Sequence, residues 1–166
     1  MGQTTLKGVP VKIGGDEINV GDFAPSVAII GKNLEEITVG GAKGVKQILV
    51  VVPSLDTEVC AAETRRFNAE AAKDKNTQVT VVSMDVPFAM GRFCSVEGIE
   101  NLNVGSDFRD KAFAKAYGVL IEDGLLSGFT CRAVFVIDGD GKVSYKEIVA
   151  EITDEPNYEA ILSFAT

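Results

Sequence analysis

Histidine is absent from this chain of 166 residues, and cysteine is scarce. Without histidine the chain cannot carry a Ser-His-Asp or Cys-His catalytic group, and it cannot form a histidine-based zinc site. The three cysteines, Cys60, Cys94 and Cys131, are odd in number and too few for a disulfide scaffold of this size. If one of them is reactive, a helix terminus or a nearby Arg or Lys side chain must activate it.

Positive charge is also in short supply, because 16 Lys and Arg residues face 24 Asp and Glu residues and leave a net charge of -8. Such a balance argues against binding to nucleic acid or to anionic membranes, since both need basic surfaces. Hydrophobic residues make up 46% of the chain, and the length suits one domain over residues 1–166. No apolar run is long enough to span a membrane, and residues 1–15 lack the pattern of a secretory signal, so we expect a cytoplasmic protein.

The pattern of apolar runs and turn residues predicts an α/β domain. The run 47–52 consists mainly of β-formers, which indicates a strand that is covered on both faces. In the helix expected next, Cys60, Thr64, Phe67 and Ala71 recur at helical spacing and form the predicted buried stripe. We expect Glu63 on that helix to point elsewhere.

The rest of the chain predicts further strands and helices. Segment 34–39 fits either a helical turn or a strand. The other expected elements are a hairpin within 4–13, strands at 27–30, 78–84, 104–107, 132–137 and 142–149, and helices at 87–97, 110–117 and 156–164. The turn Asp138-Gly139-Asp140-Gly141 makes the last two strands an antiparallel pair, and it lacks the later glutamate that a calcium loop requires. This order describes a thioredoxin-like α/β layout.

The junction between strand 47–52 and the next helix carries the strongest functional pattern, P-x-x-x-T-x-x-C, formed by Pro53, Thr57 and Cys60. Pro53 cannot donate to a strand ladder and ends the strand, and the Thr57 hydroxyl can lie beside the cysteine sulfur. The first turn of a helix favours a thiolate, because unpaired N–H groups and the positive end of the helix dipole gather there. A buried, inert cysteine with a helix-capping threonine is the alternative reading, which the combination of the three residues disfavours.

Longer motifs resemble a known family. PSLDTEVC followed by AAETRRFN resembles the peroxidatic motif of peroxiredoxins. The segments DVPFAMGRFCSVEGIEN, FAKAYGVLIEDG, RAVFVID and EITDEPNYEAIL resemble the bacterial thiol peroxidase subfamily, of the atypical 2-Cys type. The similarity runs from about Lys12 to the C-terminus. It implies a thioredoxin-like fold of the peroxiredoxin type, with a central mixed sheet flanked by helices and an N-terminal β-hairpin.

The resemblance also implies a role for each matching residue. Cys60 matches the peroxidatic cysteine, whose thiolate attacks a peroxide oxygen and becomes a sulfenic acid. Thr57 matches the threonine that holds the peroxide, and Pro53 matches the proline that shields the site. Arg132 matches the arginine that stabilises the thiolate, although a surface ion pair is the default for a single arginine. Cys94 matches the resolving cysteine, which implies a redox disulfide between Cys60 and Cys94.

This disulfide leads us to expect a change in conformation, because bridged cysteines need Cα atoms within about 7 Å. We place Cys60 and Cys94 at the starts of two helical segments, and we expect both segments to unwind partly during the reaction. An inert buried thiol is the alternative for Cys94. Because side chains alternate along a strand, Cys131 and Arg132 should point to opposite faces. Cys131 is then a bystander, with an intermolecular disulfide as the less favoured role.

The function that the resemblance implies is a thiol-dependent peroxidase for hydrogen peroxide and organic hydroperoxides, with no metal, haem or other cofactor. It further implies thioredoxin as the reductant and a homodimer as the assembly. Two other functions stay open. A disulfide oxidoreductase is disfavoured because the chain has no C-x-x-C. A redox sensor that passes its disulfide to a partner shares the first chemical step with the enzyme, so the sequence hardly separates the two.

Overall fold

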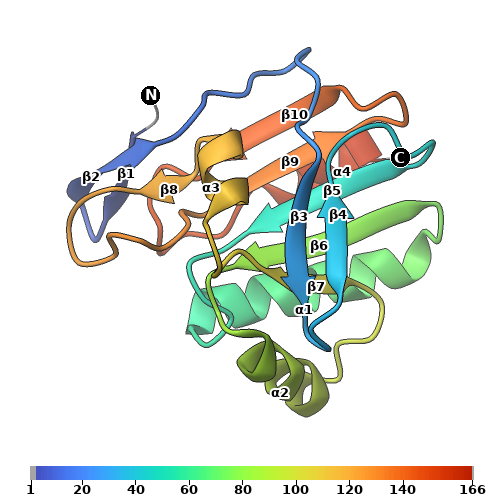
Figure 1. Cartoon of the computed structure of the whole chain (residues 1–166), viewed down its shortest axis with the longest axis horizontal. Helices are drawn as coiled ribbons and strands as arrows, with labels where there is room; N and C mark the ends of the chain where they lie inside the picture. Colours follow the sequence, from blue (N-terminus) through green and yellow to red (C-terminus); the bar gives the residue numbers. More distant parts are fainter. Residues whose placement is uncertain (1–2, 166) are drawn as a thin grey trace.

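The computed structural model of the chain describes residues 3–165 and contains two β-sheets. The larger sheet has seven strands in the order β10-β9-β5-β6-β7-β3-β4, and the smaller has the order β1-β2-β8 (Figure 1). The elements in chain order are β1 (Gln3–Leu6), β2 (Val9–Gly14), β3 (Val27–Gly31), β4 (Glu36–Val39), β5 (Lys46–Val51), α1 (Glu58–Lys73), β6 (Thr77–Ser83), α2 (Pro87–Glu97), β7 (Asn103–Ser106), α3 (Ala112–Tyr117), β8 (Leu120–Ile121), β9 (Ala133–Ile137), β10 (Val143–Ile148) and α4 (Tyr158–Ala165).

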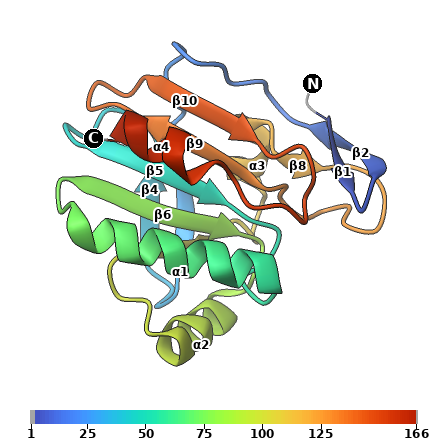
Figure 2. The same cartoon turned by 180° about the vertical axis from the view of Figure 1, so that it is seen from behind.

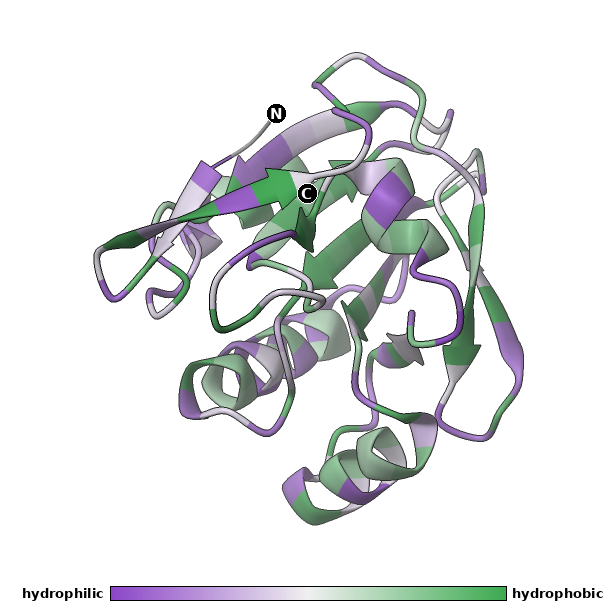
Figure 3. Ribbon diagram, turned by 60° about the vertical axis from the view of Figure 1, so that its left-hand side comes forward, coloured by the Kyte–Doolittle hydropathy of each residue, from purple (hydrophilic) through white to green (hydrophobic). Residues whose placement is uncertain are grey.

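The larger sheet is mixed, and helices cover both of its faces. Strands β5, β6 and β7 run parallel, whereas β9 and β3 join them antiparallel. Figure 2 shows α1 and α4 on one face with α2 below α1, and Figure 1 shows α3 on the other face. Figure 3 shows the central strands as mostly hydrophobic, while hydrophobic and polar residues mix along the helices. The mixed sheet with flanking helices and an N-terminal hairpin confirms the predicted fold class.

Strand β5 shows why both faces of this sheet must be covered by helices. Its side chains alternate between two buried clusters, with Ile48 and Val50 in the cluster beneath α1 and Leu49 and Val51 in the cluster beneath α3. Each of these four side chains is at most 2% exposed, so the strand contributes apolar area to both layers. The prediction of a strand covered on both faces is therefore confirmed, and β5 ends directly before the segment that carries Pro53.

The structure also settles the less certain elements. Segment 34–39 contains strand β4, which pairs antiparallel with β3, and helix α2 has the predicted bounds. Strand β8 was not predicted, because it has two residues and exists through its pairing with the distant β2. The N-terminal hairpin turns at Lys7 and Gly8, which both have positive φ, and Figure 1 shows β8 between the hairpin and α3.

Within residues 3–165, none of the helices has the length and apolar character that a membrane crossing requires.

Candidate active site around Cys60

Cys60 lies in the first turn of α1, as the sequence predicts, and its side chain is fully buried. The predicted stripe of Cys60, Thr64, Phe67 and Ala71 faces the sheet and is buried along its whole length. The sulfur is thus enclosed between the start of the helix and the carboxyl end of the parallel strands. All three cysteines fall within the described residues and are free thiols.

Arg132 reaches Cys60 from the other side of the site. It directly precedes β9 and is 2% exposed, which excludes the alternative of a surface ion pair. Its Nη2 donates a hydrogen bond to Cys60 Sγ at 3.2 Å, and its Nε donates to the Ile152 carbonyl at 2.7 Å. Burial by itself lowers the pKa of Arg132, but the neighbouring Cys60 and Glu63 raise it above its ordinary value, so the cation persists. A guanidinium in contact with the sulfur stabilises its thiolate form.

Glu63 corrects the sequence analysis, which expected this residue to point elsewhere. The Glu63 carboxylate is fully buried, and its Oε1 accepts a hydrogen bond from Arg132 Nη1 at 2.6 Å. Its Oε2 has no hydrogen-bond partner among the described residues. Burial raises the pKa of Glu63 to about 7, while Arg132 acts in the opposite direction. Glu63 lies three positions after Cys60, on the same face of α1, and its charge becomes tolerable there because of the distant Arg132.

This pKa predicts how stability depends on pH in a Glu63→Gln variant. The folded carboxyl holds its proton up to about pH 7, whereas the unfolded chain releases it near 4.5. The stability due to the protonated group is therefore complete below about pH 4.5 and disappears as the pH rises through 7. Urea unfolding should show the wild type losing about 3 kcal/mol relative to Glu63→Gln across this window. The control Glu36→Gln, on the exposed β4, should follow the wild type, and parallel curves for wild type and Glu63→Gln would contradict the account.

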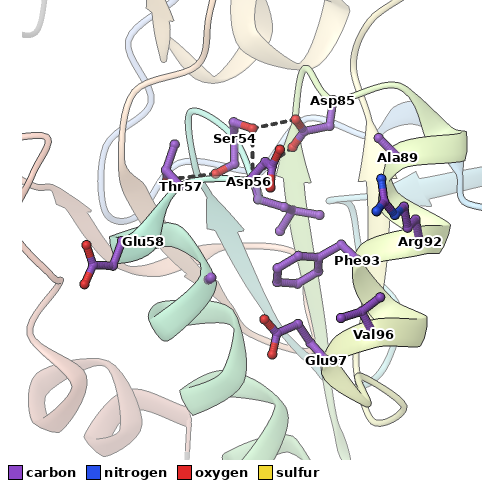
Figure 4. A pocket seen from close by; sticks show the side chains of 12 residues that line it. Ser54, Asp56, Thr57, Glu58, Asp85, Ala89, Arg92, Phe93, Val96 and Glu97 are labelled. Atoms are coloured by element: carbon purple, nitrogen blue, oxygen red, sulfur yellow. Dashed lines mark hydrogen bonds between the residues drawn. The ribbon is translucent and has the colours of Figure 1, made fainter.

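The loop before α1 is held by a second carboxylate, Asp85, to which the sequence analysis assigned no role. Asp85 accepts hydrogen bonds from Ser54 Oγ at 2.6 Å, from the Leu55 N–H at 2.7 Å and from Ser83 Oγ at 2.7 Å. Figure 4 shows the first of these contacts. Asp85 thereby joins the start of α1 to the end of β6. Asp85 follows β6 but binds the loop after β5, and a contact between such distant segments leaves no local pattern in the sequence.

Pro53 and Thr57 occupy the two ends of this loop. Pro53 is buried two positions after the end of β5, and Thr57 is the exposed N-cap residue of α1. The Thr57 hydroxyl donates to the Ser54 carbonyl at 3.1 Å, so in this structure it is not directed to the Cys60 sulfur. As a result, α1 has no side-chain hydrogen bond at its N-cap. A helix without this bond loses about 1 kcal/mol of local stability.

A cavity of about 680 Å³ opens between the start of α1 and helix α2. Thr57 and Ala61 line it from α1, and Phe93 and Val96 line it from α2, where Figure 4 shows Phe93 pointing toward the first helix. Cys60 is not part of the lining, because its side chain lies fully buried behind the first turn of α1. A small molecule in the cavity is thus separated from the sulfur by a single turn of helix.

Cys94 belongs to the same buried layer as Cys60, but the structure corrects its place in the helix. It lies in the last turn of α2 rather than at its start, and its carbonyl accepts the N–H of Ile99 at 2.9 Å. Its side chain is 4% exposed and sits in the cluster beneath α1. Burial raises the pKa of the Cys94 thiol, with Lys32 acting weakly in the opposite direction. In the resting state Cys94 is therefore a protonated thiol near the site.

Cys131 lies in the other layer. It is fully buried in the cluster beneath α3, whereas the neighbouring Arg132 reaches Cys60 on the opposite face. The prediction that the two side chains point to opposite faces is therefore confirmed. Burial raises the pKa of Cys131 to about 12, which keeps its thiol protonated and unreactive at neutral pH.

The chain is similar to proteins of known type. The sequence profile described as Redoxin matches residues 19–162. Two curated relatives are named thiol peroxidase. The one from Aquifex aeolicus is 52% identical over 158 residues, which cover 95% of this chain and 93% of the relative. The one from Campylobacter jejuni is 53% identical over 164 residues, which cover 99% and 93%.

Solved structures agree with these sequence matches. A crystal structure of a peroxiredoxin-like protein from Aquifex aeolicus has a TM-score of 0.95 at 50% identity, covering 98% of this chain and 95% of its own. A thiol peroxidase from Chromobacterium violaceum has a TM-score of 0.87, covering 97% and 93%. Its identity is 23%, so it supports the fold alone.

Proposed function

Since the chain belongs to the redoxin family and its curated relatives are thiol peroxidases, we propose that it is a peroxiredoxin-type peroxidase whose reaction takes place at Cys60. The chain is an enzyme that reduces peroxides. The observation that carries the assignment of the site is the contact of 3.2 Å between Arg132 Nη2 and Cys60 Sγ, made by a guanidinium that is almost entirely removed from water. In a chain without histidine, this contact provides the cation that a reactive thiolate needs.

In the first step, the Cys60 thiolate attacks one oxygen of the hydroperoxide. The O–O bond breaks, and its electron pair leaves with the distal oxygen, which takes up a proton and departs as water or an alcohol. Cys60 is oxidised to a sulfenic acid. Arg132 stabilises the thiolate and then the negative charge on the departing oxygen, because a preformed donor in a dry site acts strongly on developing charge. Thr57 holds the peroxide after its hydroxyl turns from the Ser54 carbonyl, and Pro53 keeps water from the site.

In the second step, Cys94 resolves the sulfenic acid. The Cys94 sulfur attacks Cys60 Sγ, water leaves, and a Cys60–Cys94 disulfide forms within one chain. Both cysteines are buried in helices in the reduced form, so parts of both helices must open first. Two local features support this opening: α1 lacks a side-chain hydrogen bond at its N-cap, next to Cys60, and Gly91 lies inside α2, three positions before Cys94. Near-identical structures of the reduced and disulfide forms would refute this opening.

The disulfide is then reduced by a dithiol protein of the thioredoxin type, and the chain works as a homodimer in the cytoplasm. These three points rest on the family rather than on contacts in this chain. The remaining alternative is a sensor that is oxidised once and hands its disulfide to a partner. Steady peroxide consumption in the presence of thioredoxin and its reductase supports the enzyme. A single stoichiometric oxidation that stops without turnover would support the sensor.

A further inference from the structure

The Arg132 guanidinium has three anchors, and one of them lies outside helix α1. Cys60 and Glu63 hold Nη2 and Nη1 from α1, whereas the Ile152 carbonyl accepts the Nε hydrogen bond at 2.7 Å. Ile152 belongs to the segment after β10 and is 3% exposed. Since the proposed reaction alters Cys60 and opens the first turn of α1, the Ile152 carbonyl is the anchor of Arg132 that does not depend on α1. The position of this carbonyl therefore matters for the whole reaction cycle.

Strand β1 holds the backbone on both sides of that carbonyl. The Ile152 N–H donates to the Thr5 carbonyl at 2.8 Å, and the Thr5 N–H donates to the Ala150 carbonyl at 2.9 Å. The Thr4 hydroxyl, which is buried, donates to the Val149 carbonyl at 2.7 Å. These contacts join residues that are more than 140 positions apart in the sequence. The N-terminal hairpin thus fixes the backbone around Ile152.

Glu151 fastens this support through its side chain. Its Oε1 accepts hydrogen bonds from Thr5 Oγ1 and from the Gly8 N–H, both at 2.8 Å. Its Oε2 accepts from the Lys7 N–H at 3.1 Å, and from the Thr153 N–H and Oγ1 at 3.0 and 2.8 Å. The bonds from Thr153 and Gly8 lower the pKa of Glu151 well below its usual range, so the group stays ionised. The Glu151 carboxylate thereby joins the hairpin turn and strand β1 to Thr153, the residue after Ile152.

We propose that Glu151 is a positioning residue of the peroxidase site, which acts by clamping β1 to segment 149–153 and so fixing the Ile152 carbonyl that orients Arg132 toward Cys60. This inference rests on the proposed function, because Arg132 matters for catalysis only if Cys60 is the reactive cysteine. The orientation of the Arg132 guanidinium can be tested independently of that function. Loss of the clamp lets the Ile152 carbonyl move, and the guanidinium then spends less time in contact with the sulfur. The Cys60 thiolate is less stabilised as a result.

The chain offers a matched control in Asp123. Its Oδ1 accepts the Lys12 N–H at 2.7 Å, so it clamps the second strand of the same hairpin. Among the described residues, the Arg132 guanidinium donates its hydrogen bonds to Cys60, Glu63 and Ile152, and none of these acceptors belongs to the segment around Asp123. Asp123→Ala thus loosens the hairpin without disturbing the carbonyl that holds Arg132.

The test compares Glu151→Ala, Asp123→Ala and the milder Thr5→Val in a Cys94→Ser, Cys131→Ala parent, where Cys60 is the remaining thiol. The pH midpoint of thiolate formation is followed by ultraviolet absorbance, and a single oxidation by hydrogen peroxide is followed by stopped flow. For Glu151→Ala we expect the midpoint to rise by about one pH unit and the rate constant at neutral pH to fall about tenfold. Thr5→Val should shift both in the same direction by less, and Asp123→Ala should leave both near the parent while lowering stability.

Two results would overturn the inference: an unchanged midpoint in folded Glu151→Ala, or an equal shift in Asp123→Ala. If Glu151→Ala does not fold, Thr5→Val decides, because an unchanged midpoint and rate constant there also refute the inference. The midpoint is measured without peroxide. Failure of the wild type to consume peroxide would refute the proposed function. The pH midpoint of Glu151→Ala would still show whether Glu151 affects the Cys60 thiolate.

Discussion

Cys60→Ser should abolish peroxide consumption, with a loss on the order of 10³-fold or more in the rate with thioredoxin and its reductase. The serine hydroxyl has nearly the shape of the thiol, but it stays protonated beside Arg132 and cannot displace the distal oxygen of a peroxide. The fold should survive, because the side chain is buried and the Arg132 donor still finds an acceptor at this position. Consumption of reductant after addition of peroxide is the measurement.

Cys131→Ala is the matched control for this result. Cys131 is as deeply buried as Cys60 but lies in the cluster on the opposite face of the sheet. The turnover of Cys131→Ala should stay within about twofold of the wild type, since the Cys131 side chain lies on the face of the sheet opposite to Cys60. Peroxidase activity that survived in Cys60→Ser, or disappeared in Cys131→Ala, would show that Cys60 is not the reactive cysteine.

Arg132→Met should slow the oxidation of Cys60 by about 10²- to 10³-fold, the usual effect of removing one preformed donor from developing negative charge. The substitution keeps a long apolar side chain but removes the bond to the sulfur and the partner of Glu63. Thiolate formation should also shift to higher pH, since Arg132 is the basic side chain that donates a hydrogen bond to the sulfur in the described structure. Stopped-flow oxidation by hydrogen peroxide, repeated across pH, separates the loss of thiolate from the loss of transition-state stabilisation.

Loss of folded protein could also lower the oxidation rate of Arg132→Met, because removing one partner of a buried ion pair costs about 3–5 kcal/mol of stability. The double variant Arg132→Met, Glu63→Gln removes that confusion, since it leaves no buried charge without its partner. We expect it to be more stable than Arg132→Met and equally slow. A double variant that recovered the wild-type rate constant would show that Arg132 acts through folding and not through the sulfur.

Much of this site could be predicted from the sequence, because its main residues follow local rules. A strand of β-formers ended by Pro53 and followed by helix-starting residues places Cys60 in the first turn of α1. The alternation of side chains along an extended segment places Arg132 and Cys131 on opposite faces. The lack of histidine directed attention to a basic side chain as the partner of the cysteine.

The remaining residues could not be predicted, because their roles depend on contacts between distant segments. The spacing of Glu63 from Cys60 fits the buried face of α1, but its charge assigned it to the surface, and it can be buried because Arg132 binds it from 69 positions later in the chain. Asp85 and Glu151 act on backbone N–H groups of other segments, which leave no mark in the sequence. Ile152 contributes a main-chain carbonyl, a group that every residue has. The place of Cys94 at the start of a helical segment was wrong, because the predicted bounds 87–97, which the structure has, put position 94 in the last turn.

The central claim is that Cys60 is oxidised by peroxide and that Cys94 then captures it within one chain. The most direct test is the intact mass and the count of free thiols, before and after one equivalent of peroxide, in the wild type and in Cys94→Ser. We predict that the wild type loses two thiols and two hydrogen atoms while remaining a single chain. Cys94→Ser should lose one thiol and gain one oxygen atom, held at Cys60 as a sulfenic acid. Loss of two thiols in Cys94→Ser without a link between chains, or a stable sulfenic acid in the wild type, would contradict the account.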